Sequence, residues 1–186
     1  PFYWAGFDAT VRYTYRIADL SDLDKVKSEF QDHVRRGIRK AEGAVEVDPD
    51  YSLEALLELN ERTYARQGVR SPDDPELVRR LDAACAARGA RRIIGAVDAQ
   101  GRAHAALYVV WDQGTCYALI NARDPELQTH GSNTLLYWEA IQHGLDHARS
   151  ALEAGNPRGA WDAAQAALAI SDRGLLPGLV LLSPSC

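Results

Sequence analysis

Hydrophobic and polar positions recur along the chain with two periods, and each period predicts one kind of element. Residues 11–17 are rich in β-branched and aromatic side chains and predict a strand. After Ser21, apolar residues follow at helical spacing and predict one helix that ends in a basic stretch at residues 35–40. The stripe consists of Leu23, Val26, Phe30, Val34 and Ile38.

A short alternating segment at residues 44–47 predicts another strand, and two helices follow it. The first covers residues 52–67, with Gly68 as a left-handed cap and an apolar face made by Leu53, Leu56, Leu57 and Tyr64. The second begins at Asp74-Pro75, because proline suits the first helical position, and ends at Gly89. Its predicted apolar stripe is Leu77, Leu81 and Cys85.

Three closely spaced strands come next, at residues 92–97, 104–111 and 115–122. Their short links favour an antiparallel meander. A fourth helix covers residues 131–148, with a buried side of Tyr137, Ile141, Gly144, Leu145 and Ala148. This order of elements predicts an α/β (α+β) fold with a largely antiparallel central sheet flanked by helices.

Composition narrows the class of protein. The 186 residues include 46% apolar and 25% charged residues, which is typical of a globular domain. The net charge of −5 disfavours a DNA-binding protein. Three isolated cysteines without zinc-ligand spacing, and no signal peptide or membrane-spanning stretch, indicate a cytoplasmic protein. His143 and His147 lie four residues apart, but no third ligand is evident, so we expect no metal.

The segment most informative about function joins the last meander strand to the fourth helix. We call residues 128–133 the carrier turn; its candidate ligand-binding residues are Gln128, His130, Gly131, Ser132 and Asn133. A helix start exposes unpaired N–H groups and the positive end of the helix dipole, so it can bind a phosphate or pyrophosphate. An ordinary loop with a glycine turn explains the same residues equally well.

The spacing Gln128-x-x-Gly131-x-Asn133 resembles the acyl-carrier motif of GNAT acyltransferases, Gln/Arg-x-x-Gly-x-Gly/Ala, with Asn at the last position. Further segments are similar to the Fem-like branch, which includes enzymes that add amino acids to peptidoglycan precursors and uncharacterised, BioF-type acetyltransferase-like relatives. They are the basic stretch at residues 35–42, Thr63-Tyr64-Ala65-Arg66-Gln67-Gly68, and Asp124-Pro125 followed by Gly131 and residues 135–141. The resemblance covers residues 1–148, which we take as a GNAT-like domain of a longer protein with an upstream part.

The resemblance implies transfer of an acyl or aminoacyl group to an amine acceptor, a small molecule or a lipid-linked cell-envelope precursor. The donor would be acyl-CoA, such as acetyl-CoA, or a charged tRNA. A backbone N–H near Leu119–Asn121 would stabilise the oxyanion, and both residues would line the carrier site. Tyr117 and Glu139 are catalytic candidates by location, although core packing or surface exposure explains them too. Arg35, Arg39 and Lys40 are candidate phosphate or substrate ligands, or a solvated helix end.

The resemblance ends near Arg149. Residues 149–186 form a divergent tail, in which the alanine-rich stretch at residues 161–170 predicts a helix. The strand that closes the carrier cleft in related domains is not evident. An alternative function is therefore a non-catalytic, incomplete module that acts in binding or is a truncated product.

Overall fold

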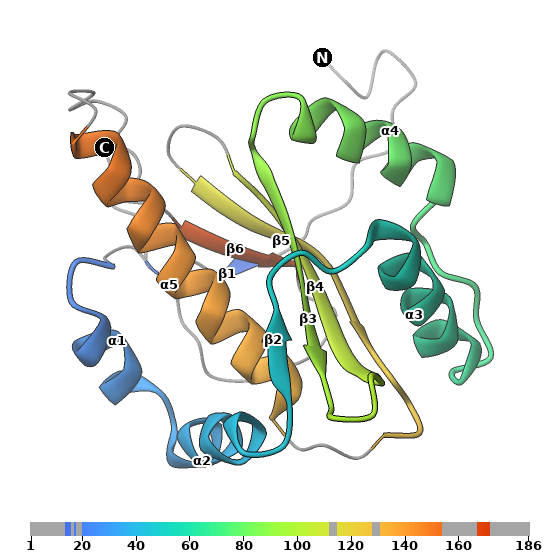
Figure 1. Cartoon of the computed structure of the whole chain (residues 1–186), viewed down its shortest axis with the longest axis horizontal. Coiled ribbons are helices and arrows are strands. Elements are labelled where there is room, and N and C mark those ends of the chain that lie inside the picture. The colour runs from blue at the N-terminus through green and yellow to red at the C-terminus, as the bar shows by residue number, and fades with distance from the viewer. Residues whose placement is uncertain are drawn as a thin grey trace, which may run out of the picture.

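The computed structural model describes residues 14–15, 17, 20–111, 115–127, 131–153 and 167–171. Within these ranges the chain forms helices on both faces of a six-stranded sheet (Figure 1). The helices are α1 (Leu23–Glu29), α2 (Asp32–Glu42), α3 (Leu53–Ala65), α4 (Pro75–Ala86) and α5 (Ser132–Glu153). The strands are β1 (Thr14–Tyr15), β2 (Glu46–Asp48), β3 (Arg91–Val97), β4 (Ala103–Trp111), β5 (Thr115–Arg123) and β6 (Ala167–Ser171). The predicted α/β fold class is confirmed.

The strands lie in the order β1-β6-β5-β4-β3-β2. Every neighbouring pair is antiparallel except β5 and β6, which run parallel. Strands β3, β4 and β5 follow one another in the chain, so their short links produce the predicted meander. Parallel neighbours need a long crossover connection, and α5 lies in the chain between β5 and β6.

One hydrophobic cluster lies on each face of the sheet. Helices α1, α2 and α5 build the first, in which α5 contributes Leu136 and Trp138. Helices α3 and α4 build the second, in which α3 contributes Leu56. Successive side chains of a strand point to opposite faces, so Leu107 of β4 enters the first cluster and Tyr108 the second. Both clusters therefore fix α5 and α3 on opposite sides of β4 and β5.

The sequence predicted one continuous helix after Ser21, and this prediction was wrong, because the structure has two helices there. α1 and α2 are separated at Phe30, whose backbone is extended (φ −65°, ψ 145°). Arg35 stabilises the break, because its guanidinium donates hydrogen bonds to the carbonyl oxygens of Ser28 and Phe30. The stripe itself still faces inward: Phe30 packs edge-on against Trp138, with ring centroids 5.8 Å apart.

The apolar stripe predicted for α4 was wrong. Leu77 is 59% exposed and Leu81 is 39% exposed, whereas Val78 is buried. Val78 shares its helix face with Asp82, which forms an ion pair with Arg91 of β3 at 3.1 Å. This face lies about 100° around the helix from the leucines. Anchoring by Val78 and Asp82 therefore turns the leucines to solvent.

The tail contains a strand where a helix was expected. Ala167–Ser171 form β6, which lies between β5 and β1, while residues 161–166 are outside the described residues. The helix propensity of alanine is weak, and pairing with the unpaired N–H and C=O groups of the β5 edge outweighs it. A strand that the sequence did not reveal thus lies beside β5, and the sheet extends past residue 148.

A buried carboxylate organises the turn between β3 and β4. Asp98 accepts hydrogen bonds from Nε2 of His104 (3.0 Å), from the guanidinium of Arg102, and from the backbone N–H groups of Gln100 and Arg102. The hydrogen bond from His104 is the largest of the causes that hold the pKa of Asp98 well below its usual range. The ionised form of Asp98 therefore stabilises this hairpin.

Asp98→Asn is expected to reduce the acid sensitivity of the fold. The folded-state pKa of Asp98 is depressed below its unfolded value near 3.8, so its contribution is present above that pH. It is lost as the pH falls through the folded pKa. Thermal melts across the acidic range should show a steeper fall in the wild type than in Asp98→Asn. Equal slopes in the two proteins would contradict this role.

Candidate carrier-binding site

β5 is paired with β6 along only part of its length. The parallel register ends at Ala118↔Ile170, and no described strand pairs with residues 119–123 on that side. On the other side, a register shift against β4 leaves Leu119 as an extra residue between Ala118 and Ile120. Such a β-bulge leaves the extra residue unpaired and bends the strand. We call residues 119–122 the open edge, because the N–H and C=O groups of Arg123 both bond to Thr63 of α3. The open edge contains the backbone groups predicted to stabilise an oxyanion.

The described part of the carrier turn begins at Gly131. Its carbonyl oxygen accepts the hydrogen bond of Leu135 N (2.8 Å), which closes the first turn of the 22-residue helix α5. Ser132 is buried and Asn133 is half-buried. The helix start carries unpaired N–H groups and a positive partial charge. Gln128, Thr129 and His130 lie outside the described residues, so their carrier-binding role stays a prediction.

Gly131 is required by a contact within the protein. Its φ is +97°, and a Cβ atom on it would lie 2.1 Å from the carbonyl oxygen of Gly37 on α2. The two glycines therefore let the backbones of α2 and of the α5 start approach closely. Gly131→Val would break this contact between α2 and the α5 start. A loss of carrier binding in that variant would therefore not show that the carrier touches Gly131, because the fold itself is disturbed. The sequence predicts Gly131 as a ligand-binding residue, whereas the structure shows that α2 occupies the side of Gly131 where a Cβ atom would lie.

Asn121 of the open edge is joined to the start of α5. Its Nδ2 donates a hydrogen bond to Oδ1 of Asn133 at 2.5 Å, and its side chain also hydrogen-bonds Tyr137. Tyr137 lies one helical turn after Asn133 and is buried, and this burial raises the pKa of its hydroxyl. The departure from the family motif at Asn133 thus has a structural use. The network holds the open edge of β5 against the first turn of α5.

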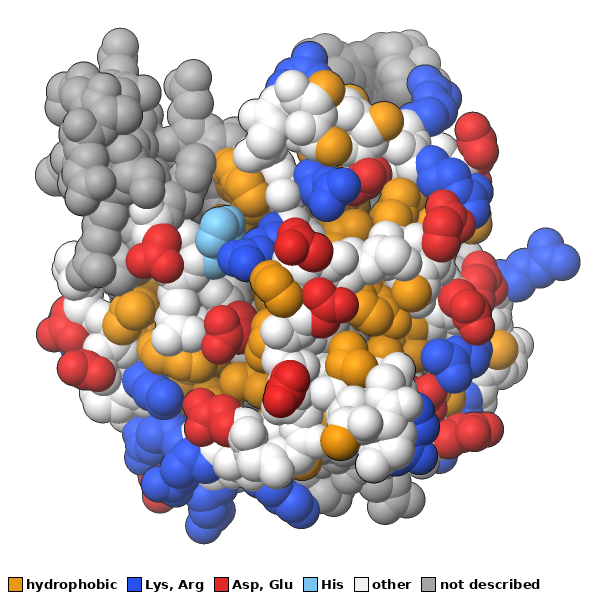
Figure 2. Space-filling view, viewed as in Figure 1, with side chains coloured by type: hydrophobic (Ala, Val, Ile, Leu, Met, Phe, Trp, Pro, Cys, Tyr) orange, Lys and Arg blue, Asp and Glu red, His pale blue; other side chains and the backbone are white. Residues whose placement is uncertain are grey.

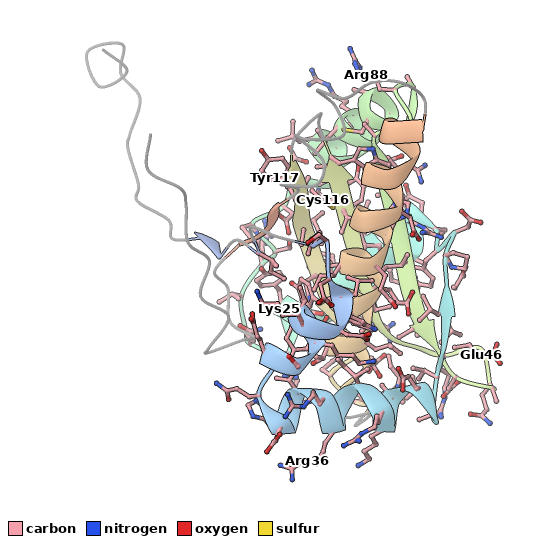
Figure 3. All side chains as sticks on the ribbon, turned by 90° about the vertical axis from the view of Figure 1, so that its left-hand side faces the viewer. Lys25, Arg36, Glu46, Arg88, Cys116 and Tyr117 are labelled. Atoms are coloured by element: carbon pink, nitrogen blue, oxygen red, sulfur yellow. The ribbon has the colours of Figure 1, made fainter. Side chains whose placement is uncertain are left out.

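The basic residues 35–40 of α2 do not form one binding surface. Arg35 is committed to the α1–α2 junction, where it also pairs with Asp32. Arg36, Arg39 and Lys40 are exposed, and Figure 3 shows Arg36 on the outer side of α2. At about 100° per residue, Lys40 lies roughly 60° from Gly37 around the helix, and Arg39 about 160° away. Because Gly37 touches Gly131, Lys40 is better placed than Arg39 to reach the α5 start.

The C-terminal half of α3 holds the segment that leads from β5 towards the carrier turn. Thr63 Oγ1 donates a hydrogen bond to the carbonyl oxygen of Arg123 (2.8 Å) and accepts one from its N–H (3.1 Å). Arg62 Nη1 lies 2.8 Å from the buried carboxylate of Asp124, and Arg66 donates to the carbonyl oxygen of Pro125. The sequence alone did not predict these contacts, although Thr63, Arg66 and Asp124 lie in segments that resemble the Fem-like branch.

The two predicted catalytic side chains are not brought together. Cys116 and Ala118 face the α5 cluster, so Tyr117, which lies between them on β5 (Figure 3), points to the α3–α4 face. Glu139 lies on α5, on the other side of the sheet, where its carboxylate accepts a hydrogen bond from Gln142 at 3.2 Å. The two residues therefore cannot act on one atom, and a catalytic role for either stays a prediction.

Neither a metal site nor a membrane-spanning helix is found within the described ranges. No group of three or more His, Cys, Asp or Glu side chains there is arranged to hold a metal ion. None of the helices there combines the length and the apolar character that crossing a bilayer requires.

Known proteins resemble this chain in both sequence and fold. Residues 28–161 match the model of the acetyltransferase (GNAT) domain family. The fold is similar to the crystal structure of FemX, with a TM-score of 0.64 and 12% identity over 74% of this chain. A GNAT family acetyltransferase of Staphylococcus aureus gives a TM-score of 0.37 and 8% identity, covering 54% of this chain and 77% of that protein.

The chain spans about half of FemX, 51% of its length. No curated protein matches the chain. The family match, residues 28–161, covers well over half of the 186 residues and includes α2, the meander, the carrier turn and α5. The chain therefore belongs to the GNAT acetyltransferase domain family.

Proposed function

We propose that this domain transfers an acyl or aminoacyl group from a carrier to an amine acceptor. The observation that carries the proposal is the open edge of β5, which lies against the first turn of α5 through the Asn121–Asn133 hydrogen bond. An acyl carrier has an extended arm and phosphate groups. Strand backbone that has no strand partner among the described residues suits the arm, and the N–H groups of a helix start suit a phosphate.

The chemistry follows from these two features. The acceptor amine attacks the acyl carbon, so that a C–N bond forms while the bond to the carrier sulfur or oxygen breaks. The nitrogen loses one proton, and the leaving sulfur or oxygen gains one. Negative charge develops on the carbonyl oxygen, and a backbone N–H of residues 119–121 is proposed to stabilise it. The protein's main contribution is to hold donor and acceptor in attack geometry.

The donor and the acceptor are proposed by class. Acyl-CoA is the first proposed donor, because the N–H groups of the α5 start suit its phosphate groups, and no metal is required for this transfer. A charged tRNA is the second proposed donor, as the resemblance to the Fem-like branch implies. The acceptor would be an amine on a small molecule or on a lipid-linked cell-envelope precursor, used in the cytoplasm.

The alternative of a non-catalytic, incomplete module rested on a missing strand. β6 supplies a parallel partner for β5 and leaves the open edge beyond Ala118. The presence of β6 supports the transferase over this alternative. We also propose that the GNAT-like domain includes β6, and so reaches beyond residue 148.

Lys40→Glu is expected to weaken CoA binding about fivefold, because an exposed cation near a phosphate contributes roughly 1 kcal/mol. Calorimetric titration with CoA measures the effect. Lys25→Glu, which reverses the charge of an exposed lysine on α1, is the matched control and should bind CoA like the wild type. Equal affinity in all three proteins would remove Lys40 from the site. No CoA binding by the wild type would leave the charged-tRNA donor, tested by transfer from aminoacyl-tRNA to an amine.

A further inference from the structure

A pocket separate from the carrier turn lies between α5 and the strands β2 and β3. Its volume is about 130 Å³. Apolar walls come from Val47, Ile94, Val109 and Ala140, and its polar groups are Arg92, Glu139 and His143. Figure 2 shows this face of the molecule, where hydrophobic side chains between α5 and β2 are bordered by acidic and basic ones. The pocket thus combines a small apolar chamber with groups of both charges.

Two nitrogen atoms of the Arg92 guanidinium contact neighbouring residues, and the third is available to a ligand. Its Nε donates to the carbonyl oxygen of Pro49 (3.2 Å), and Nη1 lies 3.1 Å from Nδ1 of His143. Nη2 has no hydrogen-bond partner among the described residues, and none of their carboxylates forms an ion pair with Arg92. A guanidinium that is half-buried and lacks a carboxylate is well suited to bind one from a ligand.

His143 is oriented by its neighbours. Because Arg92 can only donate, Nδ1 of His143 acts as the acceptor and its ring is neutral in this arrangement. The ring also packs edge-on against Trp111, with centroids 5.2 Å apart. The histidine therefore adds no second positive charge and serves to position the guanidinium.

Glu139 supplies the opposite charge. It lies four residues before His143, on the same side of α5, and lines the same pocket. Its carboxylate accepts a hydrogen bond from Gln142 but forms no ion pair with any described residue, Arg92 included. One pocket thus holds a cation and an anion that do not neutralise each other.

We propose that this pocket binds the zwitterionic head of a small α-amino acid with an apolar side chain. The ligand carboxylate pairs with Arg92, the ammonium group pairs with Glu139, and the side chain rests on Val47, Ile94 and Val109. A ligand with both charges on one carbon satisfies both protein groups at once. A plain carboxylate or a plain amine satisfies only one of them and leaves the other charge unpaired.

The pocket is distinct from the carrier site. Glu139 lies seven residues after Ser132, which is about 10 Å along the helix axis. In the sheet, β3 is separated from β5 by β4. Binding here therefore does not require a carrier at the open edge, and the proposal stands or falls independently of acyl transfer.

Calorimetric titration of the whole chain with L-valine, 3-methylbutanoate and 2-methylpropylamine tests the proposal. The three probes share the branched carbon skeleton and differ in the ammonium and carboxylate groups. The wild type should bind valine at least tenfold more tightly than either of the others, because each charged hydrogen bond contributes to affinity. Absence of valine binding, or equal affinity for all three probes, would overturn the proposal.

Single substitutions test which protein group binds which charge of the ligand. Arg92→Gln should weaken valine binding about tenfold, and Glu139→Gln should abolish the preference for valine over 3-methylbutanoate. Arg80→Gln, an exposed arginine of α4, is the control and should bind like the wild type. Melting curves check folding, and Arg92→Lys keeps the charge while losing the planar fork, so it should still weaken binding. Unchanged valine affinity in folded Arg92→Gln and Glu139→Gln would reject the site.

Discussion

Gly131→Ala is expected to destabilise the domain by about 2 to 5 kcal/mol, the sum of backbone strain at positive φ and overpacking. The added Cβ would lie 2.1 Å from the carbonyl oxygen of Gly37, and neither backbone can move away without separating α2 from the α5 start. Urea unfolding of the purified chain measures the cost. The large effect is expected because the clash is with backbone and not with a flexible side chain.

Gly101→Ala is the matched control for this variant. Gly101 also has a positive φ, +76°, but no atom lies within 4 Å of the position that its Cβ would take. This variant should cost only the strain, about 1 to 2 kcal/mol. The difference between the two alanine variants isolates the contact between Gly37 and Gly131. If both variants lost the same stability, that contact would not matter to the fold.

Asp124→Ala is expected to cost about 2 to 3 kcal/mol of stability and to lower acyl-transfer kcat/KM by more than tenfold. The Asp124 carboxylate pairs with Arg62 and accepts hydrogen bonds from the backbone N–H groups of Glu126 and Leu127. Its removal releases the segment between the open edge and the carrier turn. The open edge and the α5 start then lose their fixed separation.

The matched control is Asp73→Ala. Asp73 also holds a loop, by accepting a hydrogen bond from Asn60 Nδ2 at 3.1 Å, but this loop precedes α4. Both variants should lose stability, and only Asp124→Ala should lose affinity for CoA in calorimetric titrations. A loss of affinity of equal size in Asp73→Ala would mean that general destabilisation, and not the position of the carrier segment, explains the effect.

Elements with a strong local signal were predicted well from the sequence. Ser52 and Asp74 cap α3 and α4, and Gly68 and Gly89 adopt the positive φ expected after these helices. The meander strands agree with their predicted ranges to within one or two residues. Such features depend on hydrogen bonds between near neighbours in the chain, so a single sequence contains them.

Features that depend on distant partners were not predicted. β6 forms in an alanine-rich segment because the edge of β5 offers it hydrogen bonds. The break at Phe30 depends on the side chain of Arg35, and the exposed side of α4 depends on the ion pair of Asp82 with Arg91. No local sequence pattern indicates these three features, since each depends on a group that only folding brings close.

The candidate site shows the same division. The sequence by itself determined that a glycine turn opens a long helix after the last meander strand, because glycine spacing and helical periodicity are local. The tertiary structure decided that Gly131 meets Gly37, that Asn133 binds Asn121, and that Tyr117 and Glu139 face opposite sides of the sheet. The physical reason is that close packing and strand pairing assign each side chain its partner and its face, and neither exists before the chain has folded.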